Sequence, residues 1–276
     1  MIAADFAGKT VYVVGGSLGI GLAVARRVAA LGAHVLLFAR RREALEEAAG
    51  SVEAARQAST QRVAWRSLDA ADRTQVEQVM GEAVAAFGPP DVLVNCAGRA
   101  YPHRFEDVSY AQFDDTLRMN VHSCWNTVQV LLPHMRGRRG GYIVNTSSVA
   151  GLIGVFGYTD YCASKFAVIG FSEALRNELK PQGLTVSVLC PPDTDTPGFA
   201  IENRTKPEET RAISATAKVL SADAVAEALL DGMRSGRLLI IPGRDSRLVF
   251  LVKRLFPGLL ERVLDRTVRQ VAARRR

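Results

Sequence analysis

Short apolar segments alternate with longer Ala-, Leu- and Glu-rich segments along most of the chain. The short segments have the β-branched and aromatic composition of strands. Seven of them are predicted as strands, at residues 10–14, 34–38, 62–66, 91–95, 141–145, 185–189 and 237–241. Strands that alternate with helices form a parallel sheet, and nearly continuous apolar strands are covered on both faces. The sequence therefore predicts an α/β fold, a doubly wound sheet of seven parallel strands with helices on both faces.

The charge distribution divides the chain near residue 244. Residues 244–276 hold ten Lys/Arg and three Asp/Glu, an excess equal to the formal net charge of +7 of all 276 residues. Residues 1–243 are therefore neutral overall and long enough for one large hydrophobic core. We predict one folded domain over residues 1–243 and a basic, amphipathic helical tail over residues 244–276.

Several classes of protein are not favoured by the sequence. The N-terminus lacks the basic-then-apolar order of a signal peptide and the length of a spanning helix. The four cysteines are dispersed and have no histidine at metal-ligand spacing, so we expect no disulfide and no metal site. The basic residues of the tail are not interleaved with aromatic residues, so we expect no nucleic-acid partner. The reducing cytoplasm is the predicted compartment.

A glycine-rich turn follows the first predicted strand and precedes a helical pattern. In this context glycines permit a tight turn and close approach of the backbone to a pyrophosphate, which the helix N-terminus attracts. The predicted cofactor-binding residues of the turn are Gly15, Ser17, Gly19, Ile20 and Gly21. The alternative is an ordinary glycine-rich turn, but its position after the first strand favours a dinucleotide site.

Arginine stands where NAD-binding proteins place an acid. The second strand is followed by Arg40, about 20 residues beyond the glycines, where a carboxylate would bind the ribose 2′-hydroxyl of NAD. An arginine there pairs instead with the 2′-phosphate of NADP through charge-assisted hydrogen bonds. We predict NADPH/NADP+ as the cofactor, the alternative being that Arg40 belongs to a solvated helix start.

Tyr161 and Lys165 lie four residues apart in a helical pattern, so they share one helix face. A tyrosine phenol titrates near about 10, and a fixed cation beside it favours the phenolate and lowers the pKa. Such a phenol exchanges a proton with a carbonyl or alcohol oxygen. Tyr161 and Lys165 are therefore candidate catalytic residues.

Together these motifs resemble the short-chain dehydrogenase/reductase family over roughly residues 8–242. Further matching positions are Asp69, Asn95, Ala97, Gly98, Asn120 and Ser148. The resemblance implies a Rossmann-type fold and a reductase in which Tyr161 donates a proton while the nicotinamide delivers hydride. It also implies that Ser148 bonds the substrate oxygen, that Lys165 holds the nicotinamide ribose, and that Asn120 orders a proton-relay water. Asp69, Asn95, Ala97 and Gly98 would bind the cofactor with Tyr161 and Lys165.

The segment after the sixth strand carries the prediction of substrate. Pro191 and Thr196 match the family's turn at the nicotinamide, and residues 193–220 form a predicted lid. The segment resembles one branch of the family, which reduces a long-chain 2-amino-3-ketone with NADPH. This implies reduction of 3-ketosphinganine to sphinganine in sphingolipid biosynthesis. On charge alone, Asp193, Asp195 or Glu202 are candidates to meet the substrate ammonium. A solvated surface loop, a reductase of a 3-ketoacyl thioester, steroid or retinoid, and a non-catalytic NADPH-sensing module are the alternatives.

Apolar and basic residues occupy opposite faces of the tail. Leu260, Leu264, Val268 and Val271 share one face, and Arg262, Arg266 and Arg269 share the other. Such a helix suits the surface of an anionic membrane, where each basic residue contributes about 1 kcal/mol. We predict peripheral contact through residues 246–276 with the cytoplasmic face of a membrane. The alternative is a helix pair packed on the body or forming an oligomer interface. Because members of the family are often dimers or tetramers, the resemblance also implies a homo-oligomer.

Overall fold

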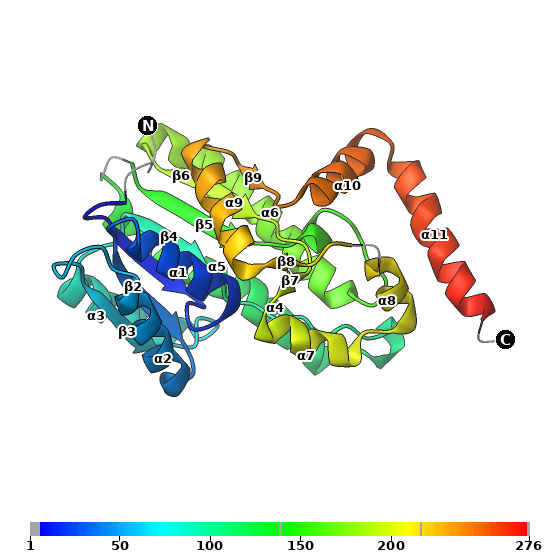
Figure 1. The fold of residues 1–276 in the computed structure, drawn as a ribbon, viewed down its shortest axis with the longest axis horizontal. Coiled ribbons are helices and arrows are strands. Elements are labelled where there is room, and N and C mark those ends of the chain that lie inside the picture. The colour runs from blue at the N-terminus through cyan, green and yellow to red at the C-terminus, as the bar shows by residue number, and fades with distance from the viewer. Residues whose placement is uncertain (1–5, 138–139, 216, 275–276) are drawn as a thin grey trace.

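The structure, a computed structural model, describes residues 6–137, 140–215 and 217–274. Residues 1–5 of the predicted domain, 216 of the predicted lid and 275–276 of the predicted tail lie outside the described residues. A seven-stranded sheet runs through the molecule in the order β3-β2-β1-β4-β5-β6-β9 (Figure 1). Every neighbouring pair in it is parallel, which confirms the predicted fold class.

The sheet strands lie close to their predicted positions. They are β1 (Thr10–Val14), β2 (His34–Ala39), β3 (Val63–Ser67), β4 (Val92–Asn95), β5 (Tyr142–Thr146), β6 (Thr185–Leu189) and β9 (Leu239–Ile240). Two short strands, β7 (Thr194–Asp195) and β8 (Leu220–Ser221), pair with each other in a separate small sheet. β7 and β8 lie at the two ends of the predicted lid, so their pairing holds these ends together.

Helices follow most of the strands. Before the lid these are α1 (Gly19–Ala29), α2 (Arg42–Ala54), α3 (Arg73–Phe87), α4 (Tyr110–Leu117), α5 (Ser123–Met135) and α6 (Thr159–Leu179). The lid holds α7 (Pro197–Thr205) and α8 (Glu208–Ser214), and the rest are α9 (Ala222–Arg234), α10 (Arg244–Leu255) and α11 (Pro257–Ala273). The predicted lid is therefore largely helical.

Both faces of the sheet are packed. Along β1, Val11 and Val13 join a core with residues of α1, α2 and α9, while Tyr12 and Val14 join one with α3, α5 and α6. Successive side chains of a strand point to opposite faces, so an apolar run is stable only when helices cover both. The strand order reverses between β1 and β4, and this edge of a parallel sheet is where nucleotides bind.

The predicted tail consists of α10 and α11, which extend from the body at the right of Figure 1. Phe250 of α10 packs against the core residues around Ile241, and α11 packs on α8 of the lid. Leu260, Leu264 and Val268 are half-buried and Val271 is buried, so the predicted membrane face of α11 is partly covered by protein. In the described part of the chain, no helix is long and apolar enough to cross a membrane.

Candidate active site

The glycine turn is shaped by close backbone contacts. Gly15 has a φ of 79°, and a Cβ there would stand 2.5 Å from the backbone nitrogen of Ala97. A Cβ at Gly21 would stand 2.2 Å from the carbonyl oxygen of Gly15, so α1 can pack against β1 only with glycine there. Leu18 begins α1 without a side-chain hydrogen bond to its first turn among the described residues. This uncapped helix start fits a pyrophosphate, which backbone N–H groups and the helix dipole bind.

The residues expected near the adenosine end of a dinucleotide follow β1, β2 and β3. Ser17 is buried in the glycine turn, Ile20 is half-buried in α1, and the Arg40 side chain is exposed just beyond β2. Asp69 follows β3, and its Oδ1 accepts a hydrogen bond of 3.0 Å from the backbone of Ala71. The parallel strands thus bring Ser17, Arg40 and Asp69 to one edge of the sheet.

Asn95, at the end of β4, connects neighbouring elements through hydrogen bonds of its side chain. Its Nδ2 donates to Asn145 Oδ1 at 2.9 Å, and its Oδ1 accepts from Thr127 at 2.9 Å. The buried Asn95 side chain therefore fastens β4 to β5 and α5, and its effect on a cofactor is through the position of the loop that follows. In that loop, Ala97 faces Gly15 across the turn.

Tyr161, Ser148 and Lys165 meet at the N-terminal half of α6. Ser148 hydrogen-bonds the Tyr161 phenol, and Lys165 Nζ lies 5.6 Å from the centre of the Tyr161 ring. Lys165 is buried and its Nζ donates to the carbonyl of Thr146 at 2.9 Å. Ser147 instead donates to the carbonyl of Lys165 at 2.8 Å, so its hydroxyl holds α6 in place rather than contacting the phenol. The predicted catalytic residues on α6 are therefore adjacent in space.

The pKa of the Tyr161 phenol is raised, opposite to the direction expected from its cationic neighbour. Burial is the largest cause, and the negative charge of Glu202 adds to it, while the bond from Ser148 works the other way. Burial also lowers the pKa of the Lys165 amino group. In the protein alone, desolvation therefore outweighs the attraction of the Lys165 cation for a phenolate, and the phenol is held in its protonated form.

Asn120 lies in a π-helical turn, Arg118–His122, between α4 and α5. Its Oδ1 accepts from the backbone of Arg99 at 2.9 Å, and its Nδ2 donates to Ser164 of α6 at 3.0 Å. A Cβ at Gly98 would stand 2.8 Å from Asn120 Oδ1 and 3.2 Å from Lys165 Nζ. The side chains of Asn120 and Lys165 therefore both lie close to Gly98. The sequence could not show the extra residue in this helical turn, which is a feature common at functional sites.

The segment after β6 returns to the glycine turn. Pro191 is buried, and its carbonyl accepts hydrogen bonds from Val149 at 3.0 Å and from Ser148 at 3.5 Å. Thr196 caps α7 by accepting from Phe199 at 3.1 Å, and a Cβ at Gly19 would stand 3.0 Å from its methyl group. Pro191 and Thr196 thus lie between Ser148 and the glycine turn.

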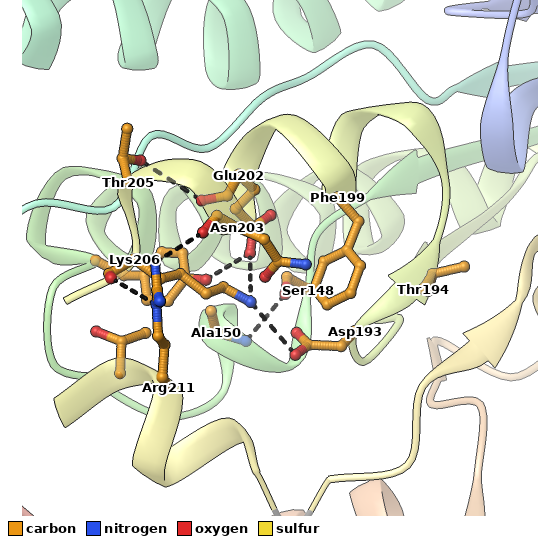
Figure 2. A network of polar contacts seen from close by, with 12 residues as sticks. Ser148, Ala150, Asp193, Thr194, Phe199, Glu202, Asn203, Thr205, Lys206 and Arg211 are labelled. Carbon is orange, nitrogen blue, oxygen red and sulfur yellow. Dashed lines mark hydrogen bonds and ion pairs between the residues drawn. The ribbon is translucent and has the colours of Figure 1, made fainter. Parts of the chain in front are cut away.

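A polar cluster under the lid was not foreseen in this form. Tyr158 donates to Glu202 of α7, and Lys206 Nζ lies 3.2 Å from Glu202 Oε1 and 3.5 Å from Asp193 Oδ2 (Figure 2). The side chain of Asp195 is exposed in β7 and is not part of this cluster. The spacing of Glu202 and Lys206 by one helical turn was the sequence signal for this ion pair. The same pattern is equally typical of charged residues on a solvent-exposed segment.

A strand-turn-helix dinucleotide site beside a Ser, Tyr and Lys set defines a nicotinamide-dependent oxidoreductase. The family model for short chain dehydrogenase matches residues 9–207. The chain is 40% identical over 240 residues to a 3-ketodihydrosphingosine reductase of Bos taurus, covering 87% of this chain and 72% of the relative. It is 41% identical over 240 residues to a 3-dehydrosphinganine reductase of Danio rerio, with the same coverage.

A solved structure agrees with these relatives. A short chain dehydrogenase/reductase from Burkholderia phymatum in complex with NAD superposes with a TM-score of 0.81 at 26% identity, covering 92% of this chain and 96% of that one. The chain belongs to the short-chain dehydrogenase/reductase family. It is an oxidoreductase that acts on a CH–OH/C=O group and uses a nicotinamide cofactor.

Proposed function

We propose that the protein reduces the 3-keto group of 3-ketosphinganine to the hydroxyl of sphinganine in sphingolipid biosynthesis, with NADPH as cofactor. The observation that carries the substrate is the similarity, over 87% of the chain, to two reductases named for this ketone. The acids beneath the lid are consistent with an amino group beside the ketone.

The residues around Tyr161 suit proton donation to a ketone oxygen. A bound nicotinamide supplies the hydride that adds to the carbonyl carbon. The oxygen then takes a proton from the phenol of Tyr161, which burial keeps protonated. Ser148, which already hydrogen-bonds this phenol, orients the same oxygen, and Lys165 compensates the charge left on the phenolate.

The proposal of NADPH rests on the end of β2. Arg40 is exposed there, next to the start of α2, and the first turn of α2 begins at Arg42. A 2′-phosphate placed at this strand end would meet guanidinium groups, whereas a free 2′-hydroxyl would find no carboxylate immediately after β2. Because NADH lacks the 2′-phosphate, these guanidinium groups would bind NADH less tightly than NADPH.

The test is an assay of nicotinamide oxidation with three ketones. We expect 3-ketosphinganine to be reduced with a higher kcat/KM than a 3-ketoacyl thioester or a steroid ketone, and faster with NADPH than with NADH. A higher kcat/KM for the thioester or the steroid would assign the site to another ketone. Binding of NADPH without turnover of any ketone would instead favour a non-catalytic sensing module.

We also propose that α10 and α11 contact an anionic membrane surface. Leu248, Leu251 and Leu255 lie one helical turn apart on α10 and are exposed, and Phe256, Leu259 and Val263 continue this apolar row onto α11. Ten Lys/Arg in residues 244–276 supply the opposite charge to the lipid headgroups. This exposed row differs from the half-buried face of α11 that contacts α8.

Removal of this apolar row should release the protein from vesicles. In a flotation assay with anionic liposomes, we expect the full chain to float and a Leu251→Ser/Leu255→Ser/Leu259→Ser variant to stay in the protein fraction. Leu260→Ser, on the half-buried face, is the matched control for a general loss of apolar residues. Equal flotation of the full chain and the triple variant would contradict the proposal.

Exposed aromatic residues on α5 and α6 support the predicted homo-oligomer. Trp125 is 51% exposed and Phe166 is 46% exposed, although Trp125 also packs on Phe171 of α6 at a ring distance of 5.3 Å. Large aromatic side chains on adjacent exposed helices are typical of subunit interfaces. We propose that two copies of the chain associate through α5 and α6.

A further inference from the structure

Lys206 is a buried cation on the lid. It follows the last residue of α7, and its side chain is only 2% exposed. Its ammonium lies 3.2 Å from Glu202 Oε1, 3.5 Å from Asp193 Oδ2 and 4.3 Å from the centre of the Phe199 ring (Figure 2). The carbonyl of Lys206 accepts from Arg211 at 3.1 Å, which fixes the turn that leads into α8.

The charges of this cluster do not balance. Two carboxylates, Glu202 and Asp193, face the one ammonium of Lys206, so the three groups carry one net negative charge when ionised. Burial raises the pKa of Glu202, although the Tyr158 hydroxyl and the Lys206 ammonium both work in the opposite direction. The carboxylate side chains are only 17% (Glu202) and 26% (Asp193) exposed, and charges withdrawn from water are stabilised by opposite charges, so the cluster has affinity for a cation.

The cluster adjoins the atoms that react. Tyr158, which donates to Glu202, has its ring 5.6 Å from that of Tyr161. The negative charges of Glu202 and Asp193 both act on the Tyr161 phenol. In a 2-amino-3-ketone the amino-bearing carbon is bonded to the carbonyl carbon. The amino nitrogen is therefore only three bonds from an oxygen held by Tyr161 and Ser148, beside the phenol on which both acids act.

We propose that Lys206 is a specificity-determining residue whose ammonium holds the place between Glu202 and Asp193 that the ammonium of the substrate takes during turnover. This inference rests on the proposed reduction of an amino-ketone. The lid then closes on either of two cations, its own lysine or the substrate. A ketone without an amino group leaves Lys206 in place and gains nothing from the two acids.

The exchange of one cation for another is energetically feasible. Lysine and the substrate amine are both primary ammonium groups, so the carboxylates keep their charge partner and little net desolvation is added. The long side chain of Lys206 can turn outward from its place at the end of α7, where its ammonium becomes hydrated. Competition from Lys206 weakens binding of the substrate amine, so removal of the Lys206 ammonium should strengthen that binding.

The first experiment compares two substrates, 3-ketosphinganine and its analogue without the amino group. For Lys206→Met with saturating NADPH, we expect the KM for 3-ketosphinganine to fall about tenfold, about 1.4 kcal/mol. The KM for the deaminated ketone should stay within about twofold of wild type, which is below about 0.5 kcal/mol. Lys206→Arg, which keeps the cation, should not lower the KM for the amino-ketone.

Lys218→Met is the matched control, because Lys218 is an exposed lysine of the same lid. A rise in both KM values for Lys206→Met would show that Lys206 serves only to hold the lid, and would overturn the proposal. If the wild-type protein does not prefer the amino-ketone to its deaminated analogue, the proposed function fails instead. The two failures are therefore distinct.

A second measurement uses the wild-type chain and needs no variant. Reductive methylation followed by mass spectrometry reports the exposure of each lysine. In the presence of NADP+, we expect Lys206 to be nearly unreactive and to become reactive when sphinganine is added, while Lys218 reacts equally in both states. Sphinganine that binds but leaves Lys206 protected would overturn the exchange.

Discussion

Replacement of Tyr161 by phenylalanine should lower kcat for ketone reduction by about 10³-fold, within the range that a positioned proton donor contributes. The substitution removes one oxygen and leaves the ring that packs near Tyr158 and Lys165. The ketone oxygen then develops negative charge with Ser148 as its remaining hydrogen-bond donor. Steady-state rates with 3-ketosphinganine measure the loss, and quenching of protein fluorescence by NADPH should give nearly the wild-type dissociation constant.

Tyr158→Phe is the matched control for Tyr161→Phe. It also removes a phenol from the same helix start, but the Tyr158 hydroxyl donates to Glu202 rather than to Ser148. We expect this variant to keep kcat within about tenfold of wild type, since it loses a single hydrogen bond to a charged group. If Tyr161→Phe retained most of the reductase activity, another group would have to supply the proton.

The fold was predictable because most of the sheet strands are apolar on both faces. Val11 and Tyr12 enter opposite cores, so the run containing them reads as continuous rather than alternating, and this pattern is specific to a covered parallel strand. The strands β7 and β8 have two residues each, too few to show any period. Their pairing depends on the return of the chain after α8, which is a tertiary contact.

The candidate site was predictable where spacing along one element fixes geometry. Tyr161 and Lys165 lie on one helix, and Gly15 and Gly21 lie in one turn, so local sequence determines both pairs. The environment of Lys206 depends instead on Asp193, which is 13 residues away across the lid. Whether a charged residue is solvated or buried is decided by such packing, and the sequence pattern does not contain it.

Burial also explains why the structure differs from two expectations, the direction of the Tyr161 pKa and the exposure of one face of α11. The direction of the pKa of Tyr161 depends on desolvation, which a sequence does not report. On α11, Leu260 and Leu264 form one apolar row and Leu259 and Val263 form another. The period alone cannot tell which row packs on α8, and in the structure the exposed row is Leu259 and Val263.

Lys165→Met should both slow catalysis and move its pH dependence. The Lys165 ammonium lies 5.6 Å from the centre of the Tyr161 ring, where a positive charge favours the phenolate. Without that charge, the pKa of Tyr161, already raised by burial, rises further. Oxidation of sphinganine with NADP+ requires the phenolate, so its kcat/KM increases as the pH rises through this pKa. The increase should therefore occur at higher pH in the variant, and kcat at pH 7 should fall about 10²-fold or more.

The pH dependence separates an electrostatic role of Lys165 from a purely structural one. Lys180→Met is the matched control, because Lys180 is an exposed lysine just beyond the end of α6. It should leave both the rate and the pH profile unchanged. A Lys165→Met variant with an unchanged profile and only a weaker affinity for NADP+ would restrict Lys165 to holding the cofactor. A profile shifted toward lower pH would contradict the sign of the interaction, because loss of a cation cannot stabilise a phenolate beside it.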